Sequence, residues 1–324
     1  MLTYSAEPAG AHHSFTGLPE RSGDAGSNLD DPAGTTSAVP GVEAGQDGSR
    51  GGESRTRRSA DRDEVVVPAE TIELFNGVDL TNFYTWLVDH HFEDPNRVFT
   101  VVDRVDGAPA IRISGEDWGG IITEDSYADY HLIVEWRWGN ATYGSRQAKT
   151  LDSGILLHAQ GPEGNYQADH NGAWMKSVEY QFIEGGTGDF ILVGGYMEPG
   201  AEQRTAPRLT STVRQDYNGQ YVWDPDGEVR EFEGGRINWY GRDPEWIDEI
   251  GFRGVQDVEN PVGEWNRSEA IADGDTFIYY LNGQMVNRGY NSSLTSGPLL
   301  FQSEGAEIYI RRIELRPLTK NRGN

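Results

Sequence analysis

Short apolar runs separated by glycine, asparagine and aspartate limit the folds open to this chain more than any other feature. The runs are about four to eight residues long, as in "VFTVVD", "SGILLH", "SVEYQFI" and "PLLFQSE". Several alternate between apolar and polar residues, which is the period of a strand with one buried face. Amphipathic helical stretches are nearly absent, and the one helical turn that we predict lies in "DPEWIDEI", with Asp243 as its cap. The pattern predicts an all-β sandwich or barrel.

Composition divides the chain into a tail and one folded domain. Residues 1–68 are rich in Gly, Ser, Ala, Pro, Asp and Arg and have no sustained apolar periodicity. All nine tryptophans lie at or beyond Trp86, while Tyr4 and Phe15 are the only aromatic residues among the first seventy. A segment of this kind buries too little apolar surface to offset its conformational entropy. We therefore predict a disordered tail over residues 1–68 and a β-domain over residues 69–318.

Two segments of the domain have readable local structure. Asn282-Gly283 in "YYLNGQMV" predicts a hairpin with a type I′ turn. The stretch from Tyr196 to Pro261 is polar and rich in glycine, and it lacks an apolar set large enough for a core of its own. We expect it to be an elaboration of the sandwich.

Charge and cysteine content exclude several classes of protein. The net charge of −25 argues against nucleic acid as a partner, since phosphate binding requires a basic surface. Cysteine is absent, which excludes disulfides and thiolate nucleophiles. No apolar run approaches the roughly 20 residues needed to span a bilayer, and the first fifteen residues do not have the pattern of a signal peptide.

Three consecutive predicted strands carry polar residues opposite their apolar faces. If these strands are neighbours, as successive antiparallel strands usually are, their polar faces form one surface. That surface would hold His131, Glu135, Arg137, Asp152, His158, Glu179 and Gln181. A solvated sheet face is the simplest explanation of such alternation, but the mixture of acid, base and amide groups also fits a site.

One carboxylate beside histidine, amide and arginine groups suits proton removal next to a carbonyl group. We expect Glu179 or His158 to act as the base, with Gln181 and Arg137 orienting or polarising the substrate. His158 and Glu179 could instead bind a divalent metal ion, a transition metal or calcium. Glu184 and Asp189, which flank "GGTG", are a second candidate pair for calcium.

Six segments, in the same order, closely resemble the 3-keto-disaccharide hydrolase family. They are "ELFNGVDLTNF", "ADYHLIVEWRWG", "DSGILLH", "SVEYQFIEGGTGD", "GEWN" with "IYYLNGQMVN", and "GPLLFQSEGAEIYIRRIELRPL". The resemblance covers residues 70 to 318. It implies a concanavalin A-like jelly-roll β-sandwich whose concave sheet binds sugar. It also implies substrates that carry a ketone at sugar carbon 3, so that the glycosidic bond leaves by elimination and water then adds.

The resemblance also assigns site residues. Glu179 and Gln181 fall on the family's E-x-Q, and Arg311 on the arginine of its last strand. Asp152 stands where the family has asparagine. His158 stands where the family often has arginine, and Glu304 stands where histidine is common. The substrate-binding set that we predict is Asp152, Trp118, Trp174, Glu135, Gln302, Glu304 and Arg311, with the two tryptophans as stacking platforms.

The resemblance thus implies a carbohydrate-active enzyme that cleaves 3-keto-glycosides, with an oligosaccharide or glycoside as substrate. The family suggests a periplasmic or secreted location, and a cytoplasmic one is the alternative. A non-catalytic lectin on the same sandwich remains open, as does a structural cell-surface protein with the tail as spacer. Fold alone does not decide between them.

Overall fold

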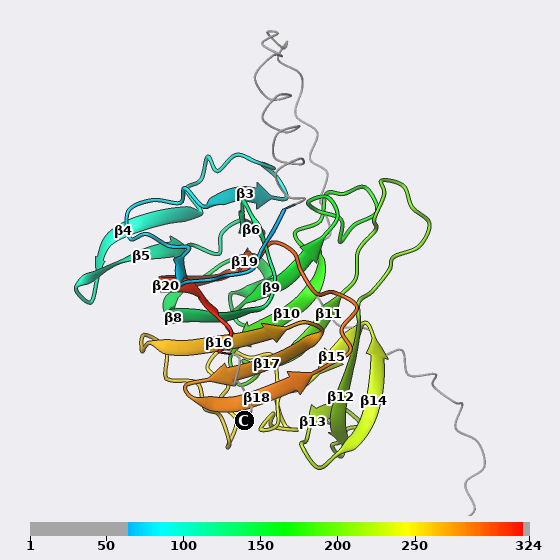
Figure 1. Cartoon of the computed structure of the whole chain (residues 1–324). Coiled ribbons are helices and arrows are strands. Elements are labelled where there is room, and N and C mark those ends of the chain that lie inside the picture. Colours follow the sequence, from blue (N-terminus) through cyan, green and yellow to red (C-terminus); the bar gives the residue numbers. More distant parts are fainter. Residues whose placement is uncertain (1–63, 320–324) are drawn as a thin grey trace, which may run out of the picture.

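The computed structural model describes residues 64–319, which form a molecule built almost entirely of antiparallel strands (Figure 1). Most of the predicted disordered tail therefore lies outside the described residues. Residues 64–68 are described, and Val65–Val66 forms β1, which pairs in parallel with β7 (Ser126–Tyr127). Within the described part, no helix has the length and apolarity to cross a membrane.

One layer of the sandwich is a seven-stranded sheet. Its strands, in spatial order, are β15 (Gly235–Ile237), β11 (Phe190–Val193), β10 (Lys176–Ile183), β9 (Asp152–Gln160), β19 (Leu300–Ser303), β6 (Gly119–Thr123) and β3 (Phe83–Leu87). Strands β9 and β10, at its centre, are buried along almost their whole length.

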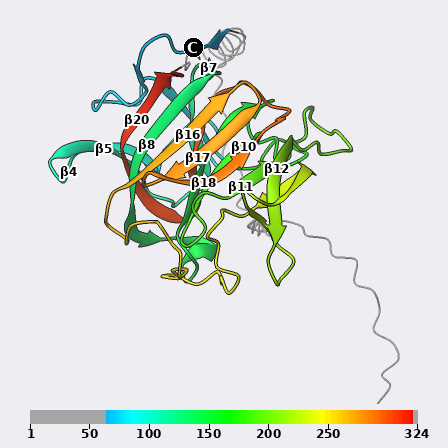
Figure 2. The ribbon, with the colours of Figure 1, turned by 60° about the horizontal axis from the view of Figure 1, so that its bottom comes forward.

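The other layer, in front in Figure 2, is an eight-stranded sheet. Its strands are β18 (Gln284–Gly289), β17 (Thr276–Leu281), β16 (Asn266–Asp273), β8 (Tyr130–Thr142), β20 (Ala306–Pro317), β5 (Ala108–Ile113) and β4 (Phe99–Val105), with β2 (Ile72–Glu73) paired to β20. The two layers make the all-β jelly-roll sandwich that the sequence predicts, and this prediction is confirmed.

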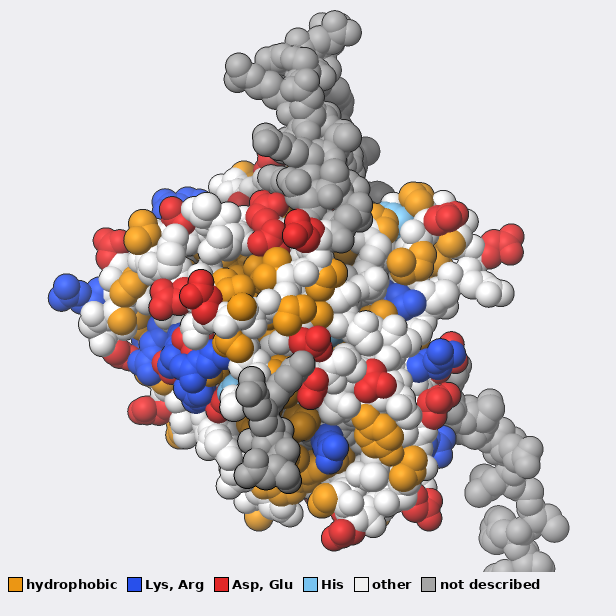
Figure 3. Space-filling view, viewed as in Figure 1, with side chains coloured by type: hydrophobic (Ala, Val, Ile, Leu, Met, Phe, Trp, Pro, Cys, Tyr) orange, Lys and Arg blue, Asp and Glu red, His pale blue; other side chains and the backbone are white. Residues whose placement is uncertain are grey.

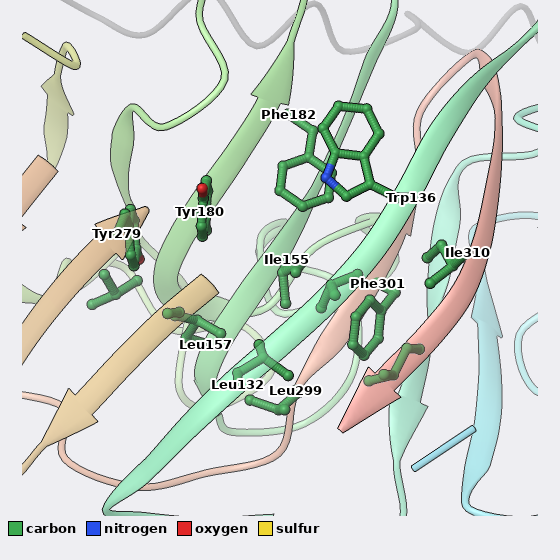
Figure 4. Packing of buried hydrophobic residues seen from close by; sticks show 14 of the residues in the cluster. Leu132, Trp136, Ile155, Leu157, Tyr180, Phe182, Tyr279, Leu299, Phe301 and Ile310 are labelled. Carbon is green, nitrogen blue, oxygen red and sulfur yellow. The ribbon is translucent and has the colours of Figure 1, made fainter. Parts of the chain in front are cut away.

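The main core fills the space between the layers (Figure 4). Trp136 of β8 stacks on Phe182 of β10 with ring centroids 4.5 Å apart, and Tyr180 of β10 stacks on Tyr279 of β17 at 4.1 Å. Aromatic pairs of this kind bury large apolar areas and add a geometric preference. They hold β10 in a fixed orientation, with its alternate residues directed away from the core.

The segment from Tyr196 to Pro261, which we expected to elaborate the sandwich, contains a three-stranded sheet. In this sheet β12 (Arg208–Gln215) lies between β13 (Tyr221–Trp223) and β14 (Glu228–Glu233). After β14 the chain enters β15 and joins the edge of the seven-stranded sheet through β11. The elaboration thereby delivers residues to the same sheet as β9 and β10.

Local predictions met different outcomes. The hairpin at Asn282-Gly283 is confirmed: it joins β17 to β18, and the two residues have φ of 49° and 82°, as a type I′ turn requires. The prediction of a helical turn near Asp243 is wrong. This segment forms non-helical turns, in which the Asp243 side chain accepts a hydrogen bond from the backbone amide of Glu245. One 3₁₀ turn, η1 (Gly144–Arg146), lies instead between β8 and β9.

The prediction that the three polar strands are neighbours is wrong. Strand β8 lies in the eight-stranded sheet between β16 and β20, whereas β9 and β10 pair with each other in the opposite layer. The segment from Tyr143 to Leu151, which includes η1, carries the chain from one layer to the other. The polar faces of β8 and β10 therefore point away from each other, on opposite sides of the molecule.

Candidate active site on the seven-stranded sheet

Glu179 and Gln181 lie on the face of β10 that points away from the main core, as the strand alternation predicts. Their neighbours Val178, Tyr180 and Phe182 pack between the layers. Glu179 and Gln181 are nonetheless buried, with 1% and 2% of their surfaces exposed. This face is therefore a covered site and not a solvated sheet surface.

Gly154 forms the floor of this site. It pairs with Gln181 across β9 and β10, and on its other side Phe301 of β19 pairs with Ile155, which brings Gln302 alongside. A β-carbon at Gly154 would lie 2.3 Å from Gln302 Oε1 and 2.7 Å from Glu179 Oε1. The absence of a side chain at Gly154 therefore allows Glu179 and Gln302 to converge on one point.

Asp152 is a second buried carboxylate, and both of its oxygens have partners. Its Oδ1 accepts a hydrogen bond from Gln181 Nε2 at 2.5 Å, and its Oδ2 lies 2.9 Å from Arg146 of η1. Arg146 also bonds to Thr150 and Asp248. Burial raises the pKa of Asp152 to about 6, although Arg146 and Arg236 oppose this change.

Glu179, in contrast, has no hydrogen-bond partner for either carboxylate oxygen among the residues that the structure describes. Burial raises the pKa of Glu179 to about 8, and the nearby Asp152 carboxylate acts in the same direction, while Arg236 and Gln302 act against it. A buried carboxyl group without partners is costly for stability. Groups of this kind cluster at functional sites.

Arg236 and Glu304 complete the site. Arg236 of β15 reaches Gln181 Oε1 at 3.4 Å and Asp189 Oδ2 at 3.7 Å, and 29% of its side chain is exposed. Glu304, just after β19, is 3% exposed. Burial, together with the charges of Asp152 and Glu179, raises the pKa of Glu304 well above its usual range. The carboxyl groups of Asp152, Glu179 and Glu304 thus interact electrostatically with one another and with Arg146 and Arg236.

His158 is not part of this cluster, and its predicted position on the polar face is wrong. Its φ of 54° turns the side chain of this β9 residue into the main core, where its ring lies 5.5 Å from that of Tyr130 and 5.0 Å from that of Phe277. Burial lowers the pKa of His158 to about 4. A neutral imidazole packed among aromatic rings, on the far side of the sheet from Glu179, is not placed to act as the base.

The residues do not fit the predicted metal sites. His158 and Glu179 lie on opposite faces of their sheet, so they cannot share an ion. The Glu184 carboxylate accepts hydrogen bonds from the backbone amides of Leu151 and Gly251. The Asp189 carboxylate accepts hydrogen bonds from Trp239 N and from the Arg242 side chain, so both carboxylates already have protein partners. Within residues 64–319, no three His, Asp or Glu side chains are grouped to hold a metal.

Glu135, Arg137 and Arg311 lie on the outer face of the eight-stranded sheet, which corrects their predicted place in the site. Glu135 accepts from Arg311 at 2.8 Å and from Arg312 at 2.9 Å. Arg137 bonds to Asp106 and lies over the Trp265 ring. Figure 3 shows a group of positive side chains on this side of an otherwise mixed surface. These residues form surface ion pairs, remote from Glu179.

Trp118 and Trp174 lie on the same side of the seven-stranded sheet as Glu179, in a second apolar cluster with Trp86, Leu156 and Ile191. Their rings are 5.9 Å apart. Trp174 is 2% exposed, so its ring is packed and not open to a sugar in this conformation. Trp118 is half-buried and packs against the same cluster, and its role as a platform stays a prediction.

Arg146 and Arg236 were not among the residues predicted from the sequence. Arg146 lies in the connection between the layers, and no pattern in the sequence marks it. Arg236 follows two glycines with positive φ, Gly234 at 75° and Gly235 at 84°. That glycine pair is a signal for a sharp change of chain direction, but it does not indicate which sheet the chain then joins.

Comparisons with known proteins bear on both the family and the fold. The model of the 3-keto-α-glucoside-1,2-lyase-like domain matches residues 70–316. Two solved structures of candidate glycosyl hydrolases from Parabacteroides distasonis are each 17% identical to the chain. The match to the first covers 81% of this chain and 96% of that protein, with a TM-score of 0.42. The match to the second covers 77% of this chain and 100% of that protein, with a TM-score of 0.40.

A carbohydrate-binding module from Bacillus subtilis is 12% identical, with 72% of this chain and 95% of the module covered and a TM-score of 0.35. Likenesses at this level do not separate an enzyme from a binding module. A search of curated proteins gave no match. The family model spans nearly the whole described domain, and it confirms the resemblance found in the sequence. The chain belongs to the family with a 3-keto-α-glucoside-1,2-lyase-like domain.

Proposed function

We propose that this protein cleaves 3-keto-glucosides by elimination followed by addition of water, with Glu179 as the base. The observation that carries the proposal is the state of Glu179: a buried carboxyl group without hydrogen-bond partners in residues 64–319, whose pKa is raised to about 8. A base with a pKa near the working pH is the most effective general catalyst. The family supplies the substrate class.

The ketone at carbon 3 makes the proton at carbon 2 acidic. Glu179 takes that proton, and its electron pair forms an enolate with the oxygen at carbon 3. When the enolate collapses, a double bond forms between carbons 1 and 2 and the glycosidic bond at carbon 1 breaks, so that the alcohol leaves. Water then adds its hydroxyl to carbon 1 and a proton returns to carbon 2, which gives net hydrolysis.

Arg236 and Gln302 are the groups that would stabilise the enolate oxygen. Arg236 brings a positive charge to a covered site, where charge stabilisation is stronger than in water. Gln302 converges with Glu179 over Gly154. Asp152, held by Arg146 and Gln181, would keep Gln181 in place and would not itself exchange a proton.

The proposed substrate is a 3-keto-glucoside or 3-keto-disaccharide. A location outside the cytoplasm remains an expectation from the family. The assay measures free sugar released from 3-keto-α-glucosides and from the matching unoxidised glucosides. The variants are wild type, Glu179→Gln and, as a matched control, Glu228→Gln, which replaces an exposed glutamate of β14.

We expect wild type and Glu228→Gln to cleave only the oxidised substrates, and Glu179→Gln to lose at least about 100-fold in rate. Cleavage of unoxidised glucosides at equal rates would contradict the elimination route. Binding of glucosides without turnover would indicate that the protein is a lectin-like binding module and not an enzyme. A chelator added to the wild-type assay tests for a metal, and we expect the rate to stay unchanged.

A further inference from the structure

We propose that Glu304 is a second catalytic residue of this site, the acid that gives a proton to the alcohol as it leaves carbon 1. This proposal rests on the function proposed above and adds the group that the elimination step still lacks. Without a proton donor, the leaving group would depart as an alkoxide, which is unfavourable for an ordinary sugar alcohol.

The backbone fixes Glu304 at the site. It lies one residue beyond the end of β19 and two residues after Gln302, and the charges of Asp152, Glu179 and Arg146 act on it. On its far side, Gly305 N donates to Gly115 O and Gly305 O accepts from Tyr143 N. Gly305 has a φ of 79°, and a β-carbon there would lie 2.5 Å from Arg146 Cγ. Glu304 is therefore held tightly between β19 and η1.

The three carboxyl groups of the site differ in how they are bonded. Both oxygens of Asp152 are held, by Gln181 and by Arg146. Glu179 has two buried oxygens without partners, and Glu304 has one, its Oε2, among the residues described. A carboxylate locked by an arginine and an amide is a poor proton carrier. Glu179 and Glu304 are therefore the two groups free to exchange protons.

Electrostatics assigns their roles. The charges of Asp152 and Glu179 act on Glu304, and carboxylates this close do not all ionise together. Once Glu179 loses its proton, its negative charge favours the protonated form of Glu304. The working state therefore holds one base and one acid.

The proton balance closes with these two groups. Glu179 receives the proton from carbon 2, and Glu304 passes its own proton to the oxygen of the departing alcohol. In the second half, Glu304, now ionised, takes a proton from water as the hydroxyl adds to carbon 1. Glu179, whose proton exchanges with water between the two halves of the reaction, then gives a proton to carbon 2, and both groups end as they began.

The test compares two leaving groups, since only a poor one requires an acid. Release of the alcohol from methyl 3-keto-α-glucoside and from 4-nitrophenyl 3-keto-α-glucoside is measured in a single turnover, which reports the step before water adds. The proteins are wild type, Glu304→Gln, Glu304→Asp, Glu179→Gln and the exposed control Glu228→Gln. We expect Glu304→Gln to keep nearly the wild-type rate on the nitrophenyl substrate and to lose about 100-fold or more on the methyl substrate. Glu304→Asp, which keeps an acid, should recover part of the methyl rate, while Glu179→Gln should lose both.

An equal loss on both substrates in Glu304→Gln, in a variant whose thermal unfolding matches wild type, would show a structural role and overturn the proposal. An unchanged methyl rate would overturn it as well. If wild type releases neither alcohol, the proposed function itself fails, which is a different result. The ratio of the two rates within each variant distinguishes these cases.

Discussion

Glu179 is the residue where stability and the proposed function conflict. The alternation of β10 places it opposite Tyr180 and Phe182, so the sequence alone predicts which face it occupies. The sequence does not predict that this face is covered, or that both oxygens of Glu179 lack partners in the described structure. Those properties depend on Gly154, Gln302 and Arg236, which come from distant segments.

Glu179→Gln should stabilise the fold at alkaline pH while it removes activity. The pKa of Glu179 is about 8 in the folded state and near 4.5 in the unfolded state, so folding favours the protonated form. The stability that this group contributes is fully present below pH 4.5 and is lost as the pH rises through 8. A pKa that differs by one between the two states corresponds to about 1.4 kcal/mol, so the difference between 4.5 and 8 gives an expected gain on the order of 4 kcal/mol in the variant at pH 8.

Urea unfolding of wild type and Glu179→Gln between pH 5 and 9 measures this gain. The control is Glu228→Gln, which changes an exposed glutamate. Equal pH dependence in all three proteins would mean that Glu179 is not held in its protonated form.

Gly154→Ala should disable the site with little effect on the fold. The new methyl group would meet Gln302 Oε1 and Glu179 Oε1, which are ends of side chains, and would lie 3.2 Å from the backbone oxygen of Tyr180. A displacement of about 1 Å in a catalytic group costs about 100-fold in rate. We expect a loss of that size in kcat/KM for 3-keto-glucosides, with a thermal midpoint within a few degrees of wild type. A fully active variant would show that Glu179 and Gln302 need not converge.

Strand β9 shows how one residue can defeat a period-two prediction. From Asp152 to Leu157 its side chains alternate as the sequence predicts. The positive φ of His158 then breaks the alternation and places two successive side chains, Leu157 and His158, on the core side. Positive φ is uncommon outside glycine, and nothing in the sequence marks it here.

His158→Phe should preserve activity and remove part of the acid sensitivity of the fold. Burial depresses the pKa of His158 to about 4 from about 6.5, so its stabilising contribution is present above pH 6.5 and is lost as the pH falls through 4. The difference between these two pKa values corresponds to about 3 kcal/mol. Between pH 7 and pH 4.5, the His158→Phe variant should lose less unfolding free energy than wild type or the surface variant His90→Phe. An inactive but folded His158→Phe would return His158 to the catalytic set.

The order of the strands sets the second limit on prediction. Gln302, Glu304 and Asp152 reach the site as the family resemblance implies, because β19 and β9 pair. Glu135, Arg137 and Arg311 do not, because β8 and β20 pair in the opposite layer. Alternation gives the face of a strand, but it does not say which sheet the strand joins.

The whole molecule carries a net charge of −25, while the outer face of its eight-stranded sheet holds ion pairs around Glu135. Salt should therefore have two opposing effects on stability. It screens the ion pairs, which lie half-buried at the surface, where such pairs are worth about 0–1 kcal/mol each. It also screens the repulsion among the excess carboxylates, which acts over the whole fold.

We expect the repulsion to dominate, so that the thermal midpoint rises between about 10 mM and 150 mM NaCl, a range in which the Debye length falls from about 30 to 8 Å. Calorimetry at fixed pH measures the midpoint. A midpoint that falls with salt would mean that the arginine–glutamate pairs contribute more than the net charge costs.

The central claim, removal of the proton at carbon 2 by Glu179, is tested most directly by cleavage in heavy water. Wild type acts on a 3-keto-α-glucoside in D₂O, and mass spectrometry counts the deuterium at carbon 2 of the released sugar. The control is the free 3-keto sugar incubated with Glu179→Gln, which measures exchange without catalysis. Elimination and rehydration predict one deuterium at carbon 2 in every molecule released, well above the control. Product without deuterium beyond the control level would contradict the account and point to direct displacement at carbon 1.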